Sequence, residues 1–293
     1  KNNNQVATAS HDKTLKLWDA QRWQSTATLH GHEDGVWKVK YSLDGKKLLS
    51  ASVDGTARLW DVSSKRAGTV LRYHSTKVYD AAINDAQTMA ATVSSDKKIA
   101  VWDLRNAGQP LFVNEECTAS VTSCDFSEDQ KAVITCNFDG HVNVIDLESR
   151  SMNVDYDTLV LSPDVRENLC YQVKTVRGLP SGGNNFILST GLGVPNLILY
   201  EGWHAEPLHR LETIAMFVGH STSVRHCEFS PDNSKMLSCC MDHSVRLWDT
   251  ATKKTSKVLA GHTDVATGCA FLNETTAVTS SWDCRVLLWN LDA

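Results

Sequence analysis

Short runs of alternating apolar and polar residues recur along the whole chain, and turn residues separate them. VWKVKYS at 36–42 and KLLSAS at 47–52 are two such runs, with Asp-Gly at 44–45 between them. Alternation with a period of two is typical of a half-buried strand, and Asp-Gly is a favoured hairpin turn. A third run carries Trp-Asp, and a fourth, such as STATLH at 25–30, leads to the next Gly-His. The pattern predicts units of four short antiparallel strands.

The Trp-bearing segment returns at a regular interval, which makes the chain a repeat protein. LKLWDA, ARLWDV, IAVWDL, VNVIDL, LILYEG, VRLWDT and VLLWNL have their anchors at Trp18, Trp60, Trp102, Ile145, Tyr200, Trp248 and Trp289. These anchors lie 41 to 55 residues apart, and an Asp precedes most of them by six positions. A period of this length is the signature of solenoids, propellers and arrays.

Four units carry a complete set of His, hydroxyl residue, Asp and Trp at the same spacing. The sets are His32, Ser50, Asp54 and Trp60; His74, Thr92, Asp96 and Trp102; His220, Ser238, Asp242 and Trp248; and His262, Thr279, Asp283 and Trp289. A buried His needs a partner for each ring nitrogen; Asp and Ser or Thr supply them, and an indole N–H completes the chain. We expect one hydrogen-bonded network in each of these units.

Two units depart from this pattern. One has Cys117 in the place of His and Ile145 in the place of Trp. The next keeps only the third strand, NLILY, and carries extra residues around SPDVREN, LPSGGNN and GWHAEPLHR. We expect these two units to be less stable than the others and their loops to be specific to this protein.

These motifs resemble the WD-repeat family, and the resemblance covers essentially the whole chain. It implies an all-β fold, a seven-bladed β-propeller of four-stranded antiparallel blades in a single domain, residues 1–293. The expected blades are 1–30, 31–72, 73–115, 116–157, 158–218, 219–260 and 261–293. The first strand of blade 1 and the last strand of blade 7 are missing from this chain, and we expect a segment before Lys1 to supply both. In the family, the four-residue network ties the outer strands of a blade to the inner ones.

Composition and charge then narrow the functional classes. With 42% hydrophobic and 22% charged residues the chain is neither disordered nor of low complexity. A net charge of −5 and a pI near 6.1 argue against direct nucleic-acid binding. The sequence contains no run of about 18 uncharged apolar residues, so it does not predict a membrane-inserted segment. Nine cysteines without C-x-x-C spacing favour a reducing compartment, the cytoplasm, with the nucleus or cilium as alternatives.

The residue types of catalysis and metal binding are present, but their arrangement favours structure. Ser or Thr, His and Asp recur four times at fixed spacing, as expected for one brace per blade and not for one active site. Cysteines at equivalent strand positions are expected in the core, so no metal or cofactor is predicted: Cys124, Cys227, Cys269, Cys136 and Cys239. A propeller enzyme is the least favoured alternative, because the charged residues of the innermost strands form no obvious catalytic set: Lys38, Lys40, Asp80, Asp125, Lys174 and Glu228.

The resemblance also implies that loops carrying the His and the Asp lie on one rim, where partner peptides dock. Residues just before the Asp and five after the His supply the predicted partner-binding set: Trp37, Tyr79, Phe138, Arg225, Met241, Trp282 and His11. Aromatic residues and Arg dominate interface energetics. The sequence therefore predicts a non-catalytic protein–protein interaction scaffold within a multiprotein assembly, with Arg225 available for an acidic group. Aromatic residues that plug the channel mouth are the alternative interpretation.

One further motif offers an alternative function. Trp102 to Arg105 resembles the W-D-x-R motif of WD-repeat substrate receptors for cullin-type ubiquitin ligases, in which the Arg contacts the ligase adaptor. An Arg at the end of a strand accounts for the same residues. The partners and the pathway do not follow from the sequence, since this architecture hosts many unrelated roles.

Overall fold

The computed structural model describes residues 5–157, 170–176, 185–190, 196–201 and 212–292. Strands are the regular secondary structure of these ranges, and they form seven antiparallel sheets, which we number one to seven in chain order. The prediction of an all-β fold is confirmed. In the same ranges no helix has the length and apolarity needed to cross a bilayer.

The chain divides into two compact units. The first comprises residues 1–126, 130–137 and 143–153, and the second comprises residues 127–129, 138–142 and 154–293. Sheets one to three lie in the first unit and sheets five to seven in the second. Sheet four, residues 121–157, has most of its residues in the first unit.

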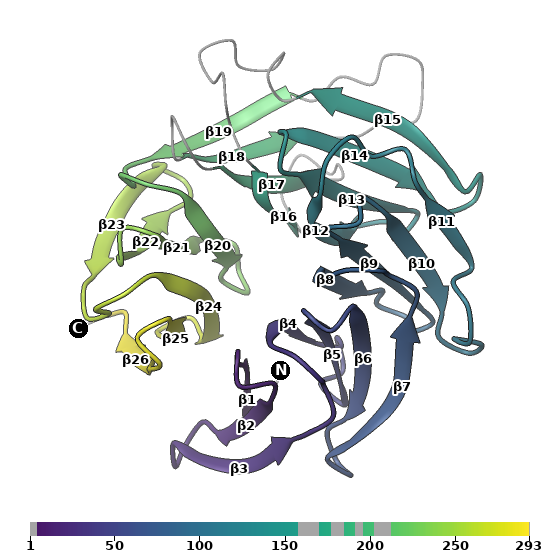
Figure 1. The fold of residues 1–293 in the computed structure, drawn as a ribbon. Coiled ribbons are helices and arrows are strands. Elements are labelled where there is room, and N and C mark those ends of the chain that lie inside the picture. Colours follow the sequence, from purple (N-terminus) through teal and green to yellow (C-terminus); the bar gives the residue numbers. More distant parts are fainter. Residues whose placement is uncertain (1–4, 158–169, 177–184, 191–195, 202–211, 293) are drawn as a thin grey trace. The chain divides into compact units, whose positions relative to one another are not determined.

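Within the first unit the sheets follow one another in chain order (Figure 1). Sheet one has three strands, β1(Gln5–Ala9), β2(Leu15–Asp19) and β3(Gln24–Leu29). Sheet two contains β4(Val36–Tyr41), β5(Lys47–Ser52), β6(Thr56–Asp61) and β7(Arg66–Arg72). Sheet three contains β8(Val78–Ile83), β9(Met89–Ser94), β10(Ile99–Asp103) and β11(Phe112–Asn114). Sheet four contains β12(Val121–Phe126), β13(Ala132–Asn137), β14(His141–Asp146) and β15(Ser151–Asp157).

The second unit repeats this arrangement. Sheet five contains β16(Cys170–Val176), β17(Asn185–Thr190), β18(Asn196–Glu201) and β19(Glu212–Val218). Sheet six contains β20(Val224–Phe229), β21(Lys235–Cys240), β22(Val245–Asp249) and β23(Lys254–Leu259). Sheet seven has three described strands, β24(Ala266–Asn273), β25(Thr276–Ser281) and β26(Val286–Asn290). The three-stranded first and last sheets agree with the expectation that each would have one strand fewer. The extra residues expected around blade five lie largely outside the described ranges.

The apolar core lies between successive sheets of a unit. Trp102 of β10 is fully buried and packs in one cluster with Leu49 and Leu59 of sheet two. In the second unit Trp248 of β22 packs with Ile187 and Phe217 of sheet five. The cysteines expected in the core, at positions 124, 136, 227, 239 and 269, are buried. Each sheet is thus stabilised by its neighbours, as in other stacked-repeat proteins.

An ion pair with a completely buried carboxylate joins the first strands of sheets two, three and four. Lys40 Nζ of β4 lies 3.0 Å from the carboxylate of Asp80 on β8, which is completely buried. Ser123 Oγ of β12 donates to the same carboxylate at 2.6 Å, and Lys40 also donates to the carbonyl of Cys124 at 3.2 Å. Burial disfavours the carboxylate, but the charges of Lys40 and Lys38 and the Ser123 hydrogen bond leave the pKa of Asp80 lowered. The network ties three neighbouring strands together.

We expect the Lys40→Met variant to lose about 3–5 kcal/mol of unfolding free energy, because it leaves the Asp80 charge buried without its ammonium partner. Urea unfolding followed by intrinsic Trp fluorescence measures this loss. Lys46→Met is the matched control, because its side chain is 80% exposed and its ammonium lies 3.9 Å from Asp44. That control should change the free energy by less than about 0.5 kcal/mol. Equal losses in the two variants would contradict the interpretation.

Candidate functional site: hydrogen-bonded networks and the rim

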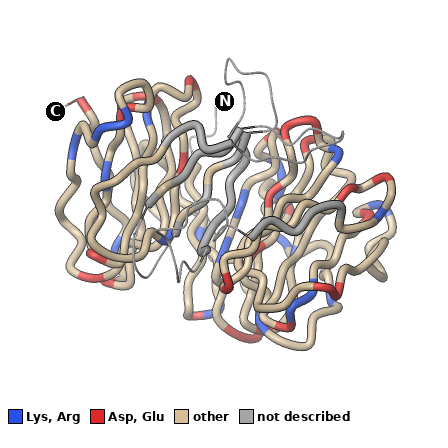
Figure 2. The backbone as a smooth tube through the Cα atoms, turned by 90° about the horizontal axis from the view of Figure 1, so that it is seen from above, with Lys and Arg blue, Asp and Glu red and all other residues tan. Residues whose placement is uncertain are grey.

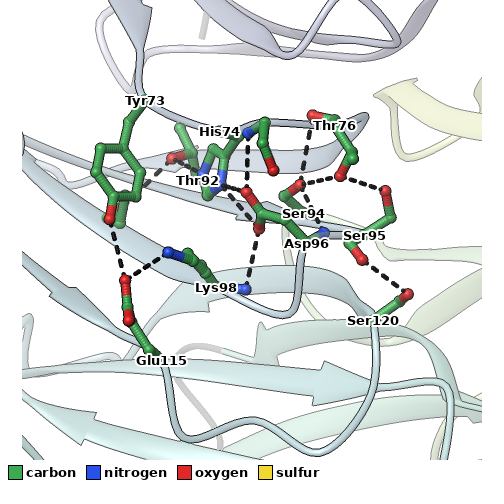
Figure 3. Close-up of polar contacts among 12 residues, drawn as sticks. Tyr73, His74, Thr76, Thr92, Ser94, Ser95, Asp96, Lys98, Glu115 and Ser120 are labelled. Atoms are coloured by element: carbon green, nitrogen blue, oxygen red, sulfur yellow. Dashed lines mark hydrogen bonds and ion pairs between the residues drawn. The ribbon is translucent and has the colours of Figure 1, made fainter.

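The four-residue set of sheet three is brought together in the structure, and Figure 3 shows His74, Thr92 and Asp96 of this set. His74, in the loop between β7 and β8, places Nδ1 3.1 Å from a carboxylate oxygen of Asp96 and Nε2 2.9 Å from Thr92 Oγ1. The indole N–H of Trp102 donates to the same hydroxyl oxygen at 3.0 Å. Asp96 stands in the turn after β9, so one network links a loop, a turn and two strands.

The other three predicted sets have the same connections. In the set of His32, Asp54, Ser50 and Trp60, the distance from His Nδ1 to the carboxylate is 2.7 Å, from His Nε2 to the hydroxyl 2.7 Å, and from the indole nitrogen to the hydroxyl 2.8 Å. The same three distances are 3.2, 2.6 and 2.7 Å in the set of His220, Asp242, Ser238 and Trp248. All three are 2.8 Å in the set of His262, Asp283, Thr279 and Trp289.

The protonation of the sheet-two network follows from its burial and its hydrogen bonds. Burial lowers the pKa of His32 more than the contact with Asp54 raises it. Burial alone would raise the pKa of Asp54, but donors at Thr56, Glu33 and His32 lower it to about 2. A neutral imidazole therefore donates through Nδ1 to a carboxylate and accepts the Ser50 hydroxyl proton at Nε2. Within this network the two ring nitrogens of His32, the Ser50 hydroxyl and the Trp60 indole N–H all have partners.

The Gly before the His leaves room for the Trp ring. A Cβ on Gly219 would lie 3.1 Å from the far edge of the Trp248 ring, and one on Gly261 would lie 2.9 Å from that of Trp289. Both contacts are closer than an ordinary van der Waals approach. The close packing of the loop on the Trp ring therefore explains why Gly precedes His at these positions.

Sheet four lacks the network, as its departing residues predict. Asn143 Nδ2 lies 3.7 Å from Cys117 Sγ and donates to Asn137 Oδ1 at 3.2 Å. Thr135 occupies the place of the central hydroxyl and is completely buried, and its Oγ1 has no hydrogen-bond partner. Neither Cys117 nor the buried Ile145 can replace the imidazole or the indole N–H.

The rim position five residues after the His has a specific backbone cause. In sheet two the strand pairing runs from Val36–Ser52 directly to Lys38–Ala51, so Trp37 is the extra residue of a β-bulge. The same register shift surrounds the equivalent residues in sheets three, four, six and seven: Tyr79, Thr122, Arg225 and Thr267. A bulge bends the strand and redirects one side chain out of the pleat. Bulges thus set the direction of these predicted rim residues.

In the first unit the bulges bring two aromatic side chains together. Trp37 is 41% exposed, and its ring centroid lies 6.2 Å from that of Tyr79 with an interplanar angle of 54°. The His11 ring lies against Gly35, so closely that a Cβ on Gly35 would overlap it. Thr122 is buried instead and donates to the carbonyl of Cys136.

In the second unit the predicted rim residues are exposed to different degrees. Trp282 is 51% exposed and is held at its backbone N–H by the carbonyl of Val265, 3.0 Å away. Met241 is held in the same way by Ser223, and the side chains of Met241, Arg225 and Phe138 are half-buried. Lys and Arg are interspersed with Asp and Glu along the described chain (Figure 2).

Arg105 of the W-D-x-R segment lies on the surface. Its side chain is 74% exposed, and its guanidinium donates to both carboxylate oxygens of Asp103, at 2.8 and 2.6 Å. This side-chain pair lowers the pKa of Asp103 to about 2. An approaching protein could reach the guanidinium but would compete with Asp103 for it.

Sequence reasoning missed two features. The pairing of Lys40 with Asp80 was not foreseen, because the two residues lie in different repeats. Cys240 was also missed, and its thiol lies beside His220 and Asp242. Aligning the repeats could have revealed Cys240, because it stands two residues before the Asp, where the other complete networks have a serine: Ser52, Ser94 and Ser281.

The comparison with sequence families agrees with the fold. The model described as WD domain, G-beta repeat matches residues 1–19, 23–61, 66–103, 108–146, 211–249 and 253–290. The chain belongs to the WD40 family. Its antiparallel sheets are therefore propeller blades of the WD40 type. The six matches omit residues 147–210, which hold the strands β15 to β18.

Individual relatives are distant. The chain is 25% identical over 205 residues to Target of rapamycin complex subunit wat1 of Schizosaccharomyces pombe, covering 57% of this chain and 65% of that protein. It is 21% identical over 313 residues to the WD repeat domain-containing protein 83 homolog of Dictyostelium discoideum, covering 96% and 89%. It is 25% identical over 210 residues to human Pre-mRNA-processing factor 17, covering 70% and 34%. The chain thus spans just under two thirds of wat1 and about a third of the pre-mRNA-processing factor.

We expect Thr92→Val to lower the free energy of unfolding by about 2–4 kcal/mol, because His74 and Trp102 each lose a buried partner at about 1–3 kcal/mol. Thr135→Val is the matched control in sheet four. It removes a hydroxyl at the equivalent position that has no partner, so it should leave the stability unchanged or raise it. Chemical denaturation of both variants measures the difference. Similar losses would show that the network is not what stabilises sheet three.

Proposed function

We propose that this chain is a non-catalytic scaffold that docks partner peptides or loops on its rim within a multiprotein assembly. The observation that carries the proposal is the exposed Trp37, which a β-bulge places beside Tyr79. Large aromatic side chains of this kind are typical anchors of protein interfaces. The relatives support the same class, since wat1 is named as a target of rapamycin complex subunit and the human relative as a pre-mRNA-processing factor.

We also propose that the seven sheets form one propeller over residues 1–293, with blades at the boundaries expected from the sequence. The support is the repetition of one sheet type along the chain and the family match on both sides of residues 147–210. In such a ring each sheet would bury its two faces against its neighbours, as the described sheets do within each unit.

The networks support a mechanical role in this scaffold. Asp54 accepts from His32 and from the backbone N–H of Glu33 at 2.9 Å, so it fixes the loop that leads to Trp37. A hydrolase would need the hydroxyl to reach a substrate. Ser50 is instead completely buried, and its oxygen already contacts His32 and Trp60. We infer that the networks hold the rim loops and carry out no reaction.

The rim suggests the chemistry of the partner. An extended segment with an apolar side chain for the aromatic residues and an acidic group for Arg225 fits the predicted set. Cys124, Cys239 and Cys240 carry no disulfide, which supports a reducing compartment such as the cytoplasm.

The double variant Trp37→Ala/Trp282→Ala tests the docking proposal. We expect it to reduce quantitative capture of partners at least about 30-fold, which corresponds to the roughly 2 kcal/mol of an interface hot spot. The thermal midpoint should stay within a few degrees of that of the parent chain. Capture is measured by affinity purification with mass spectrometry and then by titration of the partner found.

Leu43→Ala is the matched control for this experiment. Leu43 is 45% exposed but follows β4 at the end opposite Trp37, so its loss should not affect capture. Unchanged capture by the double variant would reject the docking proposal. A lower thermal midpoint with unchanged capture would support aromatic plugs of the channel mouth.

A ligase substrate receptor is the second candidate, and the exposure of Arg105 favours it. Arg105→Ala should then abolish co-purification of a cullin adaptor without changing stability, since the Asp103 pair is at the surface. Recovery of the same adaptor with the parent chain and the variant would exclude this role for Arg105.

A further inference from the structure

Three metal-ligand side chains meet in sheet six. A ring nitrogen of His220, Cys240 Sγ and a carboxylate oxygen of Asp242 all lie within 4.8 Å of one another, and His220 Nδ1 is the nitrogen that contacts Asp242. His220 comes from the loop before β20, Cys240 ends β21, and Asp242 stands in the turn that follows. Cys240 and His220 are buried, while the neighbouring Ser221 and Thr222 are exposed, so the cluster lies just beneath the surface.

Cys240 occupies a place that a hydroxyl fills in the other complete networks. In sheet three Ser94 Oγ lies 3.4 Å from the carbonyl of Thr76 and accepts from the backbone N–H of Asp96 at 3.1 Å (Figure 3). Cys240 Sγ makes both contacts, to the carbonyl of Thr222 at 3.1 Å and from the N–H of Asp242 at 3.4 Å. The backbone arrangement is preserved, and a soft sulfur ligand has replaced a hydroxyl beside the same His and Asp.

The three side chains have the chemistry of a zinc site. Thiolate sulfur, imidazole nitrogen and carboxylate oxygen are its usual protein ligands, and they surround the ion as a tetrahedron. The orientation of the His220 ring is already fixed by a hydrogen bond at its other nitrogen, because Nε2 lies 2.6 Å from Ser238 Oγ. Metal-bound His is commonly held in this way through its other nitrogen. Ser244 Oγ lies 3.4 Å from Nδ1, so this hydroxyl or a water molecule can provide the fourth ligand.

We propose that His220, Cys240 and Asp242 bind a zinc ion in sheet six. On binding, the thiol proton leaves to solvent and the sulfur takes the metal in its place. The imidazole then carries its proton on Nε2 and donates to Ser238, while Nδ1 coordinates the ion. The metal replaces the contact of His220 with Asp242, 3.2 Å long, and keeps both groups in position. The site concerns one sheet and does not depend on the docking function of the rim.

Without metal the thiol has an ordinary structural role. Burial raises the pKa of Cys240 to about 11, so the protonated thiol donates to the Thr222 carbonyl. The ion must therefore displace a firmly held proton. A soft divalent ion such as zinc is suited to this, whereas magnesium or calcium prefers oxygen ligands alone.

Titration of the full chain with Co²⁺ alone, followed by competition with Zn²⁺ alone, tests the proposal. We expect the near-ultraviolet charge-transfer band of a cobalt–thiolate bond and the visible bands of tetrahedral cobalt, at one equivalent per chain. Zn²⁺ should abolish both. Cys240→Ser should weaken Co²⁺ binding at least about 100-fold, beyond the ~10–100-fold cost of losing an outer contact to a metal ligand.

Cys240→Ser is a conservative test because it installs the residue of the other three networks, so the sheet should still fold. Cys284→Ser is the matched control: its thiol is exposed, and the variant should bind Co²⁺ as the parent chain does. Zn²⁺ should also raise the thermal midpoint of the parent chain and not that of Cys240→Ser. Absence of the thiolate band in the parent chain, or its persistence in Cys240→Ser, would overturn the proposal.

Discussion

Each complete network depends on one buried hydroxyl oxygen that accepts the indole N–H and bonds the imidazole. In sheet two this atom is Ser50 Oγ, with Trp60 and His32 at 2.8 and 2.7 Å. Burying Trp and His side chains removes apolar surface from water, but only if their polar atoms find partners inside. The hydroxyl provides both partners at once. The large rings can therefore fill the space between sheets without leaving an unsatisfied donor.

The same hydrogen bonds explain why the rim loops have fixed shapes. Asp54 holds both His32 and the backbone of Glu33, and the carbonyl of Gly35 accepts from the N–H of Val53 at 2.8 Å. These hydrogen bonds thus hold the loop in place up to Val36, the first residue of β4 that pairs with β5. The strand then contains one residue more than its partner can pair with, and Trp37 forms the bulge. A rigid interior network in this way determines the exposure of a side chain several residues away.

Much of the fold could be predicted from sequence because it depends on local patterns. Alternation predicted the strands, and fixed spacing predicted which His, hydroxyl, Asp and Trp meet. Contacts between repeats were harder to predict from sequence, since the pairing of Lys40 with Asp80 depends on how neighbouring first strands align. The exposure of a side chain was also harder to predict. Trp37 and Thr122 occupy equivalent bulges, yet the small Thr122 turns inward and donates to a carbonyl. Position in the repeat fixes the backbone, while size and polarity decide where the side chain goes.

The departures from the repeat show where such a chain can vary. In sheet four the loss of His and Trp leaves Thr135 without a partner, yet Val133 and Ile145 still pack against sheet three. A stacked repeat tolerates this because each sheet is also stabilised by its neighbours. In sheet six the variation is a single atom, sulfur for oxygen at position 240, within unchanged hydrogen bonds. A scaffold that fixes side chains so firmly can therefore acquire new chemistry by one substitution, because the geometry of the neighbouring ligands is already in place.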